Sequence, residues 1–135
     1  MIKEAYISFE TAKLLKEKGF NEPTLYYYIR GHLFKGYDYQ PNSERPAISA
    51  PTQSHVMRYF REVHNLHIEV GVSNDYSDDA DGNEVETWYF WSFSIYGLPT
   101  GNVIYDDLQQ FDCTEYESYE DAVEAGIVYV LNNLI

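Results

Sequence analysis

Residues 50–72, APTQSHVMRYFREVHNLHIEVGV, constrain the fold more than any other stretch, because a helical period changes there to a strand period. Val56, Phe60 and Val63 recur at intervals of four and three residues, which predicts one apolar face of a helix. Pro51 suits the first turn of that helix, and Asn65 is typical of the residue that ends one. Apolar and polar residues then alternate through residues 66–72, so a strand with one buried face follows the helix directly.

A second strand is predicted at residues 85–96, the most aromatic part of the chain. The intervening residues 74–86, NDYSDDADGNEVE, are polar and contain a glycine, which indicates a long hairpin loop. We therefore predict that residues 66–72 and 85–96 pair as the central hairpin of an antiparallel sheet.

Further elements are predicted on both sides of this hairpin. Ser8 can cap a helix over residues 9–18, which Gly19 ends, and Ser118 can cap the last helix. Gly126 lies inside that last helix, where glycine is unfavourable, so we expect the helix to approach the sheet closely there. Residues 25–39 are interpreted as one bent strand or a short hairpin, and residues 40–50, with two prolines, as an extended surface connection.

Together these elements predict an α+β fold, with an antiparallel sheet of about four strands and three helices mainly on one face. A chain of 135 residues is expected to form a single domain, residues 1–135. The expected core consists of apolar residues on the inward faces of the predicted elements: Phe9, Ala12, Leu15, Phe20, Val56, Phe60, Val63, Ile68, Val70, Trp91, Phe93, Ile95, Val123, Ile127, Val130 and Leu131.

Charge is divided unevenly along the chain, whose net charge is −13. Residues 1–61 hold all nine Lys and Arg and six acidic residues, whereas residues 62–135 hold the other sixteen acidic residues. Such asymmetry indicates either an interaction surface or simply a charged, solvated surface. Because there is no apolar run of about 18 residues, no apolar signal-peptide core and only one cysteine, we expect a cytoplasmic protein without membrane contact.

The acidic stretch is the first candidate for a metal site. Asp79 and Asp81 fit a calcium-binding loop with Gly82 at its sixth position, but Ser77 and Trp88 fall where ligands are required. A solvated hairpin tip is the better interpretation.

Other reactive residues also lack a recognisable arrangement. His55, His64 and His67 do not have the spacing of a zinc site, and Cys113 has no neighbouring cation that would activate a thiol. We therefore expect no catalytic residue, cofactor or metal.

The aromatic residues favour protein binding over nucleic-acid binding. They could stack on bases, but the aromatic strand lies in the half of the chain without Lys or Arg. Trp88, Phe90 and Tyr96 alternate with expected core residues, so they lie on the other face of the strand. We hypothesise that this face, with Tyr26 and Tyr28, is an interface for a homodimer or for an unknown protein, unless residues 40–50 or the last loops cover it.

Three blocks of the sequence carry a resemblance. They are ISFETAKLLKEKGF at residues 7–20, the run APTQ, YFRE and HNLHIEV within residues 50–70, and SYEDAVEAGIVYVL at residues 118–131. The blocks resemble a group of small proteins of unknown function encoded by bacteriophages, prophages and conjugative elements of gut bacteria. The resemblance spans most of the chain except the middle loops. It implies a genetic setting of that kind and no mechanism, because none of the blocks is a catalytic motif.

The sequence leaves three functions open. The first is a small cytosolic accessory protein that binds another protein, in agreement with the resemblance to mobile-element proteins. The second is an acidic decoy, resembling DNA in its charge, that inhibits a DNA-binding protein. The third is a small enzyme whose site has no recognised motif.

Overall fold

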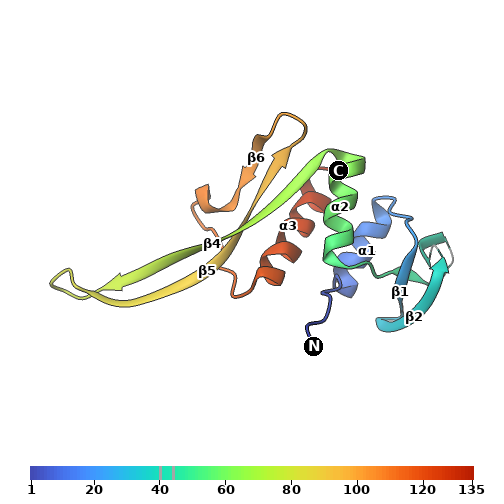
Figure 1. Ribbon diagram of the computed structural model, residues 1–135, viewed down its shortest axis with the longest axis horizontal. Helices are drawn as coiled ribbons and strands as arrows, with labels where there is room; N and C mark the ends of the chain where they lie inside the picture. The colour runs from blue at the N-terminus through green and yellow to red at the C-terminus, as the bar shows by residue number, and fades with distance from the viewer. Residues whose placement is uncertain (40, 44) are drawn as a thin grey trace. The chain divides into compact units, whose positions relative to one another are not determined.

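The computed structural model describes residues 1–39, 41–43 and 45–135. Within these residues three α-helices and six antiparallel strands are present, which confirms the predicted α+β class (Figure 1). The strands form two sheets of three instead of one sheet of about four. Two positions of the extended connection predicted at residues 40–50 lie outside the described residues.

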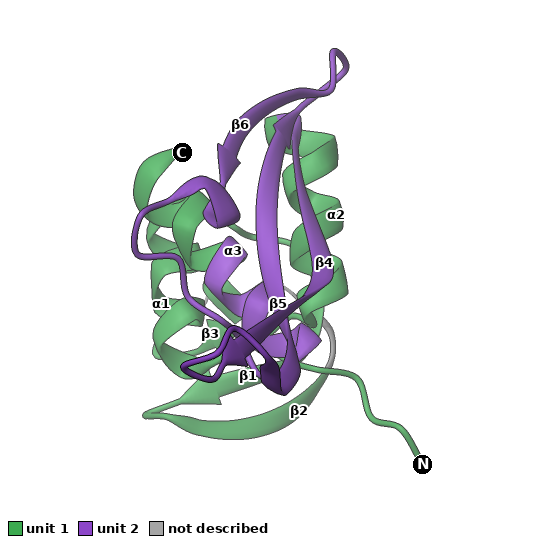
Figure 2. Ribbon diagram, turned by 90° about the vertical axis from the view of Figure 1, so that its left-hand side faces the viewer, with its two compact units in different colours: residues 1–64, 127–135 green, residues 65–126 purple. Residues whose placement is uncertain are grey.

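The chain divides into two compact units, residues 1–64 with 127–135 and residues 65–126 (Figure 2). The first unit contains the helices α1 (Phe9–Glu17) and α2 (Gln53–His64) and the strands β1 (Thr24–Ile29), β2 (His32–Tyr39) and β3 (Ile48–Ser49). The second contains β4 (Leu66–Asp78), β5 (Glu84–Gly97) and β6 (Asn102–Asp106), and α3 (Tyr119–Asn133) runs from the second unit into the first. That residues 1–135 fold as one domain stays a prediction.

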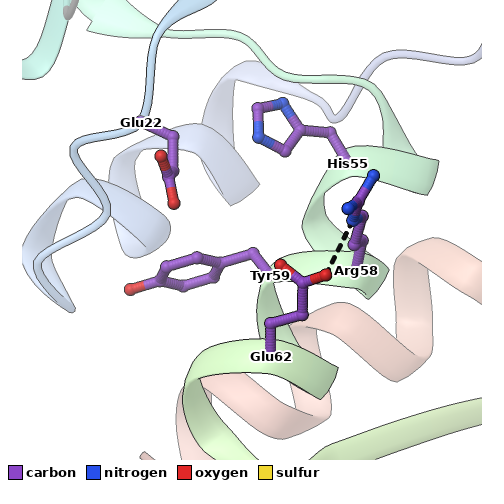
Figure 3. A pocket seen from close by; sticks show the side chains of 5 residues that line it. All are labelled: Glu22, His55, Arg58, Tyr59 and Glu62. Carbon is purple, nitrogen blue, oxygen red and sulfur yellow. Dashed lines mark hydrogen bonds and ion pairs between the residues drawn. The ribbon is translucent and has the colours of Figure 1, made fainter.

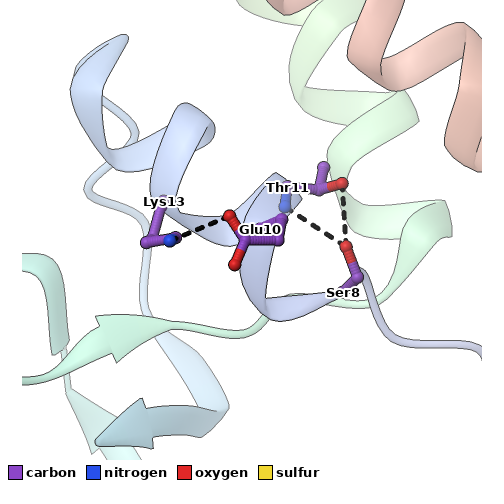
Figure 4. Close-up of polar contacts among 4 residues, drawn as sticks. All are labelled: Ser8, Glu10, Thr11 and Lys13. Carbon is purple, nitrogen blue, oxygen red and sulfur yellow. Dashed lines mark hydrogen bonds and ion pairs between the residues drawn. The ribbon is translucent and has the colours of Figure 1, made fainter. Parts of the chain in front are cut away.

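Helix α1 begins and ends as the sequence predicts. The Ser8 hydroxyl accepts a hydrogen bond from the backbone N–H of Thr11 at 3.2 Å and donates one to the Thr11 hydroxyl at 3.0 Å (Figure 4). Gly19 has a φ of +90°, and the next residue, Phe20, donates its backbone N–H to the carbonyl oxygen of Leu15 at 3.2 Å. This left-handed ending places Phe20, which is 1% exposed, back against the helix.

The first sheet has the strand order β2-β1-β3, and residues 25–39 form a hairpin within it. Ile29 pairs with His32 across a two-residue turn in which Arg30 and Gly31 have φ values of 51° and 81°. Positive φ at both turn residues matches the twist of the flanking strands, which explains the tight connection.

Helix α2 is buried along its predicted apolar face, except at its last turn. The hydroxyl of Thr52 accepts the backbone N–H of His55 at 3.1 Å and caps the helix. Val56 and Phe60 are fully buried, but Val63 is 53% exposed, so its place in the predicted core is wrong. Periodicity puts Val63 on the same helix face, but burial also depends on what packs opposite each turn, which periodicity does not determine.

The second sheet has the order β4-β5-β6 and confirms the central hairpin. Ile68 pairs with Ile95 and Val70 with Phe93. The predicted long loop over residues 74–86 is wrong, because the ladder continues, past a register shift after Ser77, to the pair Asp78–Glu84, and only a short turn joins the strands. Polar side chains are compatible with a strand whose two faces meet water, since the ladder satisfies the backbone groups in either case.

Helix α3 approaches this sheet closely at Gly126, as predicted. A Cβ atom at Gly126 would lie 2.9 Å from Cγ2 of Ile68 and 3.3 Å from Cδ2 of Phe93. Of the other expected core residues, Phe9, Val70 and Trp91 are half-buried. The remaining members of the expected core, apart from Val63, are buried. No helix in the described ranges has the length and apolar character needed to cross a bilayer.

Candidate protein-interaction site

The outer part of the β4–β5 hairpin is a two-stranded ribbon, which we call the hairpin arm (residues 72–91). Strand β6 pairs only with the end of β5, between Ser94 and Gly97. At Trp91 the backbone N–H and carbonyl groups bond to those of Tyr116, at 2.8 and 3.0 Å. Beyond this bridge, the described residues pair only β4 with β5, and Figure 1 shows the two strands continuing well past β6.

One face of the arm carries large apolar side chains in contact with solvent. Val72, Tyr76 and Tyr89 are 57, 58 and 68% exposed. The register Val72–Trp91, Asn74–Tyr89 and Tyr76–Thr87 puts all three on one face. We call these three residues the apolar stripe. The stripe lies on the same face of the hairpin as Ile68 and Phe93. Helix α3 covers that face at Ile68 and Phe93.

The outer edge of β4 is also open. In an antiparallel pair, residues that do not bond to each other direct their N–H and C=O groups to the outer edges. Trp91 directs both groups to Tyr116, so its partner Val72 directs both to the outer edge of β4. Because this direction alternates from residue to residue, Asn74 and Tyr76 also direct their N–H and C=O groups to the outer edge. Consistent with this, the N–H of Tyr76 bonds to its neighbour Asp75 at 2.8 Å and not to β5.

A shallow groove of about 310 Å³ lies on the arm. It is lined by three consecutive residues of β4, Val72, Ser73 and Asn74, together with Tyr89. The groove therefore joins two residues of the apolar stripe, Val72 and Tyr89, to the edge strand β4.

The arm is strongly acidic. It contains six carboxylates and no Lys or Arg: Asp75, Asp78, Asp79, Asp81, Glu84 and Glu86. At its tip one oxygen of Asp79 accepts the backbone N–H groups of Asn83 and Asp81, each at 2.9 Å. These hydrogen bonds lower the pKa of Asp79, and the one from Asn83 has the largest effect. Across the described residues no group of three or more His, Cys, Asp and Glu is arranged to hold a metal ion.

The residues of β5 in the predicted aromatic interface are less exposed than those of the apolar stripe. Phe90 is only 8% exposed, so its assignment to an exposed patch is wrong. Tyr96 is half-buried, and Trp88, 37% exposed, donates its indole N–H to Glu115 at 2.7 Å. Alternation along β5 correctly predicts which residues share a face. It does not predict which residues of each face are covered by other elements. Whether Trp88 and Tyr96 belong to an interface stays a prediction.

The two tyrosines predicted to join that interface belong to the first unit. The ring of Tyr26 packs edge-on against Tyr6, with centroids 4.8 Å apart. Tyr28 donates its hydroxyl to the carbonyl oxygen of Ile7 at 2.8 Å and packs against Phe9. Both are half-buried, so each is engaged within its own unit.

The first unit contains a pocket that sequence reasoning missed. It has a volume of about 230 Å³ and is lined by Glu22, His55, Arg58, Tyr59 and Glu62 (Figure 3). Four of these residues are spaced at three or four positions along α2, a signal for one helix face that the sequence offered. Arg58 and Glu62 form an exposed ion pair at 2.9 Å.

Burial acts on two titratable groups of this pocket. Burial lowers the pKa of His55, against the opposing charge of Glu22, and burial raises the pKa of Tyr59. The imidazole is therefore neutral at pH 7 and packs edge-on against Phe20. Among the described residues no hydrogen bond joins the His55 ring to a carboxylate that would orient it as a general base.

Two other histidines and the cysteine do not line this pocket. His64 packs against Tyr59 in the first unit, and His67 bonds to Glu69 at 2.9 Å in the second. Cys113 is a free, half-buried thiol.

Comparison of the chain with protein-family models, with curated proteins and with solved structures found no match. The resemblance to mobile-element proteins stays a prediction.

Proposed function

We propose that this is a small cytosolic accessory protein that acts by binding another protein through the hairpin arm. In keeping with the resemblance of its sequence blocks, we propose that it is encoded on a mobile genetic element. The observation that carries the proposal is the apolar stripe, three large side chains that are more than half exposed on one continuous face. Burial of a large apolar side chain contributes about 1.5–3 kcal/mol, so covering the stripe would supply a substantial part of a binding energy.

The stripe also has the chemical character of a binding surface. Tyrosines are large and rigid and have a polar tip, and they recur among the residues that dominate binding energies. Tyr76 and Tyr89 lie on opposite strands of the ribbon, two residues out of direct register and on the same face, so a partner can contact both.

The test compares two double variants. Tyr76→Ser with Tyr89→Ser removes the two tyrosines of the stripe, and Val103→Ser with Ile104→Ser removes two apolar residues of β6 that are 59 and 46% exposed. Proteins bound by the wild type from a host-cell lysate are cross-linked and quantified by mass spectrometry. We expect the stripe variant to lose its specific partner while the β6 variant retains it. Equal retention by both variants would rule out the stripe as the binding site.

The stripe variant should keep its fold, because its side chains lie beyond the region that α3 covers. Its far-UV circular dichroism and melting temperature should match those of the wild type, since exposed substitutions usually change stability by less than about 0.5 kcal/mol. Sedimentation velocity of the wild type and the variant tests the alternative that the partner is a second copy.

An acidic decoy for a DNA-binding protein is the second candidate, because residues 62–135 carry sixteen acidic residues without Lys or Arg. Affinity of such a decoy would fall steeply as salt rises, whereas affinity through the stripe would change less. Measuring the dissociation constant of the captured partner at low and high salt separates the two functions.

A further inference from the structure

The open edge of β4 suggests how the partner binds, provided that the arm is the binding site as proposed. Exposed strand edges are usually protected by proline, by several charged side chains, above all lysine, by a bulge or by a covering segment, whereas residues 71–77 contain one charged residue, Asp75. Between Gly71 and Ser77 strand β4 has neither proline nor lysine, and its register with β5 is regular up to Ser77. No strand of the described chain pairs with its outer side.

Backbone groups at this edge are available to another strand. Val72 and Asn74 direct their N–H and C=O groups outward, and both residues are exposed and line the groove. The N–H of Tyr76 is bonded to the side chain of Asp75, which can move away when an incoming strand supplies a carbonyl oxygen. An extended segment could therefore continue the sheet along these three residues.

The negative charge of the arm distinguishes between a second copy of β4 and a basic segment as the added strand. A second copy paired edge to edge would bring the carboxylates of the two β4 strands together, and like charges on neighbouring strands are destabilising. A strand with basic side chains would instead place them beside Asp75, which is exposed. The acidic arm thus disfavours a second copy and favours a basic partner.

We propose that the hairpin arm binds an extended segment of another protein in which basic and apolar residues alternate, added as a strand to the outer edge of β4. Apolar residues of the segment lie beside Val72 and Tyr76, on the face of the stripe. The basic residues point to the other face, where Ser73, Asp75 and Ser77 lie. Hydrogen bonds between the two backbones supply the affinity, and the alternation of basic and apolar side chains supplies the specificity.

The probe is a seven-residue peptide of alternating lysine and valine, labelled for fluorescence anisotropy. Two control peptides have the same length. One replaces each lysine by glutamate, and the other keeps the lysines but carries N-methyl groups on alternate backbone nitrogens, on the edge that would meet β4. We expect the first peptide to bind at least about tenfold more tightly than either control, because each control removes charge pairing or several backbone hydrogen bonds.

The matched protein variants are Asn74→Pro and Asn74→Ala. Proline removes the outward N–H of residue 74 and is tolerated on an edge strand, where that N–H does not bond within the sheet. We expect Asn74→Pro to weaken peptide binding about tenfold or more and Asn74→Ala to leave it within about twofold, with unchanged circular dichroism in both. Slowed amide hydrogen exchange at Val72 and Asn74 on adding the peptide would support strand addition.

Several results would overturn this inference. They are no binding of the lysine–valine peptide, equal binding of the N-methylated peptide, or equal binding by Asn74→Pro and Asn74→Ala. If one of these occurs while the stripe variant still loses its natural partner, the arm remains the binding site but does not bind by strand addition. If the stripe variant keeps its natural partner, the proposed function itself fails.

Discussion

Replacing Gly126 by alanine tests the close approach of α3 to the second sheet. In an exposed helix interior this change stabilises by about 1 kcal/mol. Here the new Cβ would meet Cγ2 of Ile68 at 2.9 Å and the ring of Phe93 at 3.3 and 3.4 Å. Both neighbours are buried, at 1 and 3% exposure, and the Ile68 methyl group sits on a β-branched carbon that cannot rotate away freely. Overpacking of a filled core costs about 1–3 kcal/mol.

The two effects have opposite signs, and the overpacking is the larger. We expect Gly126→Ala to lower the free energy of unfolding by about 1 kcal/mol, which corresponds to a decrease in melting temperature of about 4 °C for a chain of this size. Urea unfolding followed by tryptophan fluorescence reports on the second unit, which contains both tryptophans. Gly71→Ala is the matched control, because a Cβ atom there has no neighbour within 4 Å, and it should be neutral or slightly stabilising.

A second variant identifies the contact responsible. Leucine has no methyl group at the Cγ2 position, so Ile68→Leu removes the atom that the new Cβ at position 126 would contact while keeping the volume. In the double variant, Gly126→Ala should cost at least about 0.5 kcal/mol less than it does alone. A rise in stability for Gly126→Ala in the wild-type background would refute the close approach.

Three further predictions concern the first unit. Ser8→Ala should lower the free energy of unfolding by about 1 kcal/mol in urea denaturation, because it removes the cap on the N–H of Thr11, and an unchanged value would contradict the capping. Arg30→Asn should raise the melting temperature slightly, because asparagine tolerates the positive φ next to Gly31 better than arginine does, while Arg30→Val should lower it. Burial lowers the folded-state pKa of His55 below its ordinary value of 6.5, so the unfolded chain binds more protons than the folded protein below that pH. Stability should therefore fall as pH drops through 6.5, and His55→Gln should reduce this slope; a slope identical to that of the wild type would exclude the histidine as its source.

Local structure follows from short-range residue chemistry, and the sequence was sufficient to predict it. The caps at Ser8 and Ser118, the left-handed positions at Gly19 and Asn65 and the close approach at Gly126 depend on backbone geometry within a few residues. The strand pairing around Ile68 was also predictable, because a period of two marks a buried face and the aromatic run supplied its partner.

Exposure depends instead on what lies opposite each residue, and only the tertiary structure decides that. Val63 continues the stripe of α2 but is exposed, and Phe90 lies on the strand face opposite the expected core but is buried. The polar residues 74–86 extend as strands because their partners across the ladder satisfy the backbone, a pairing that composition does not reveal. The apolar stripe and the open edge of β4 arise in the same way. The alternation in the sequence determines which side chains share a face, whereas the places where α3, β6 and Tyr116 stop covering the hairpin determine which of them meet solvent.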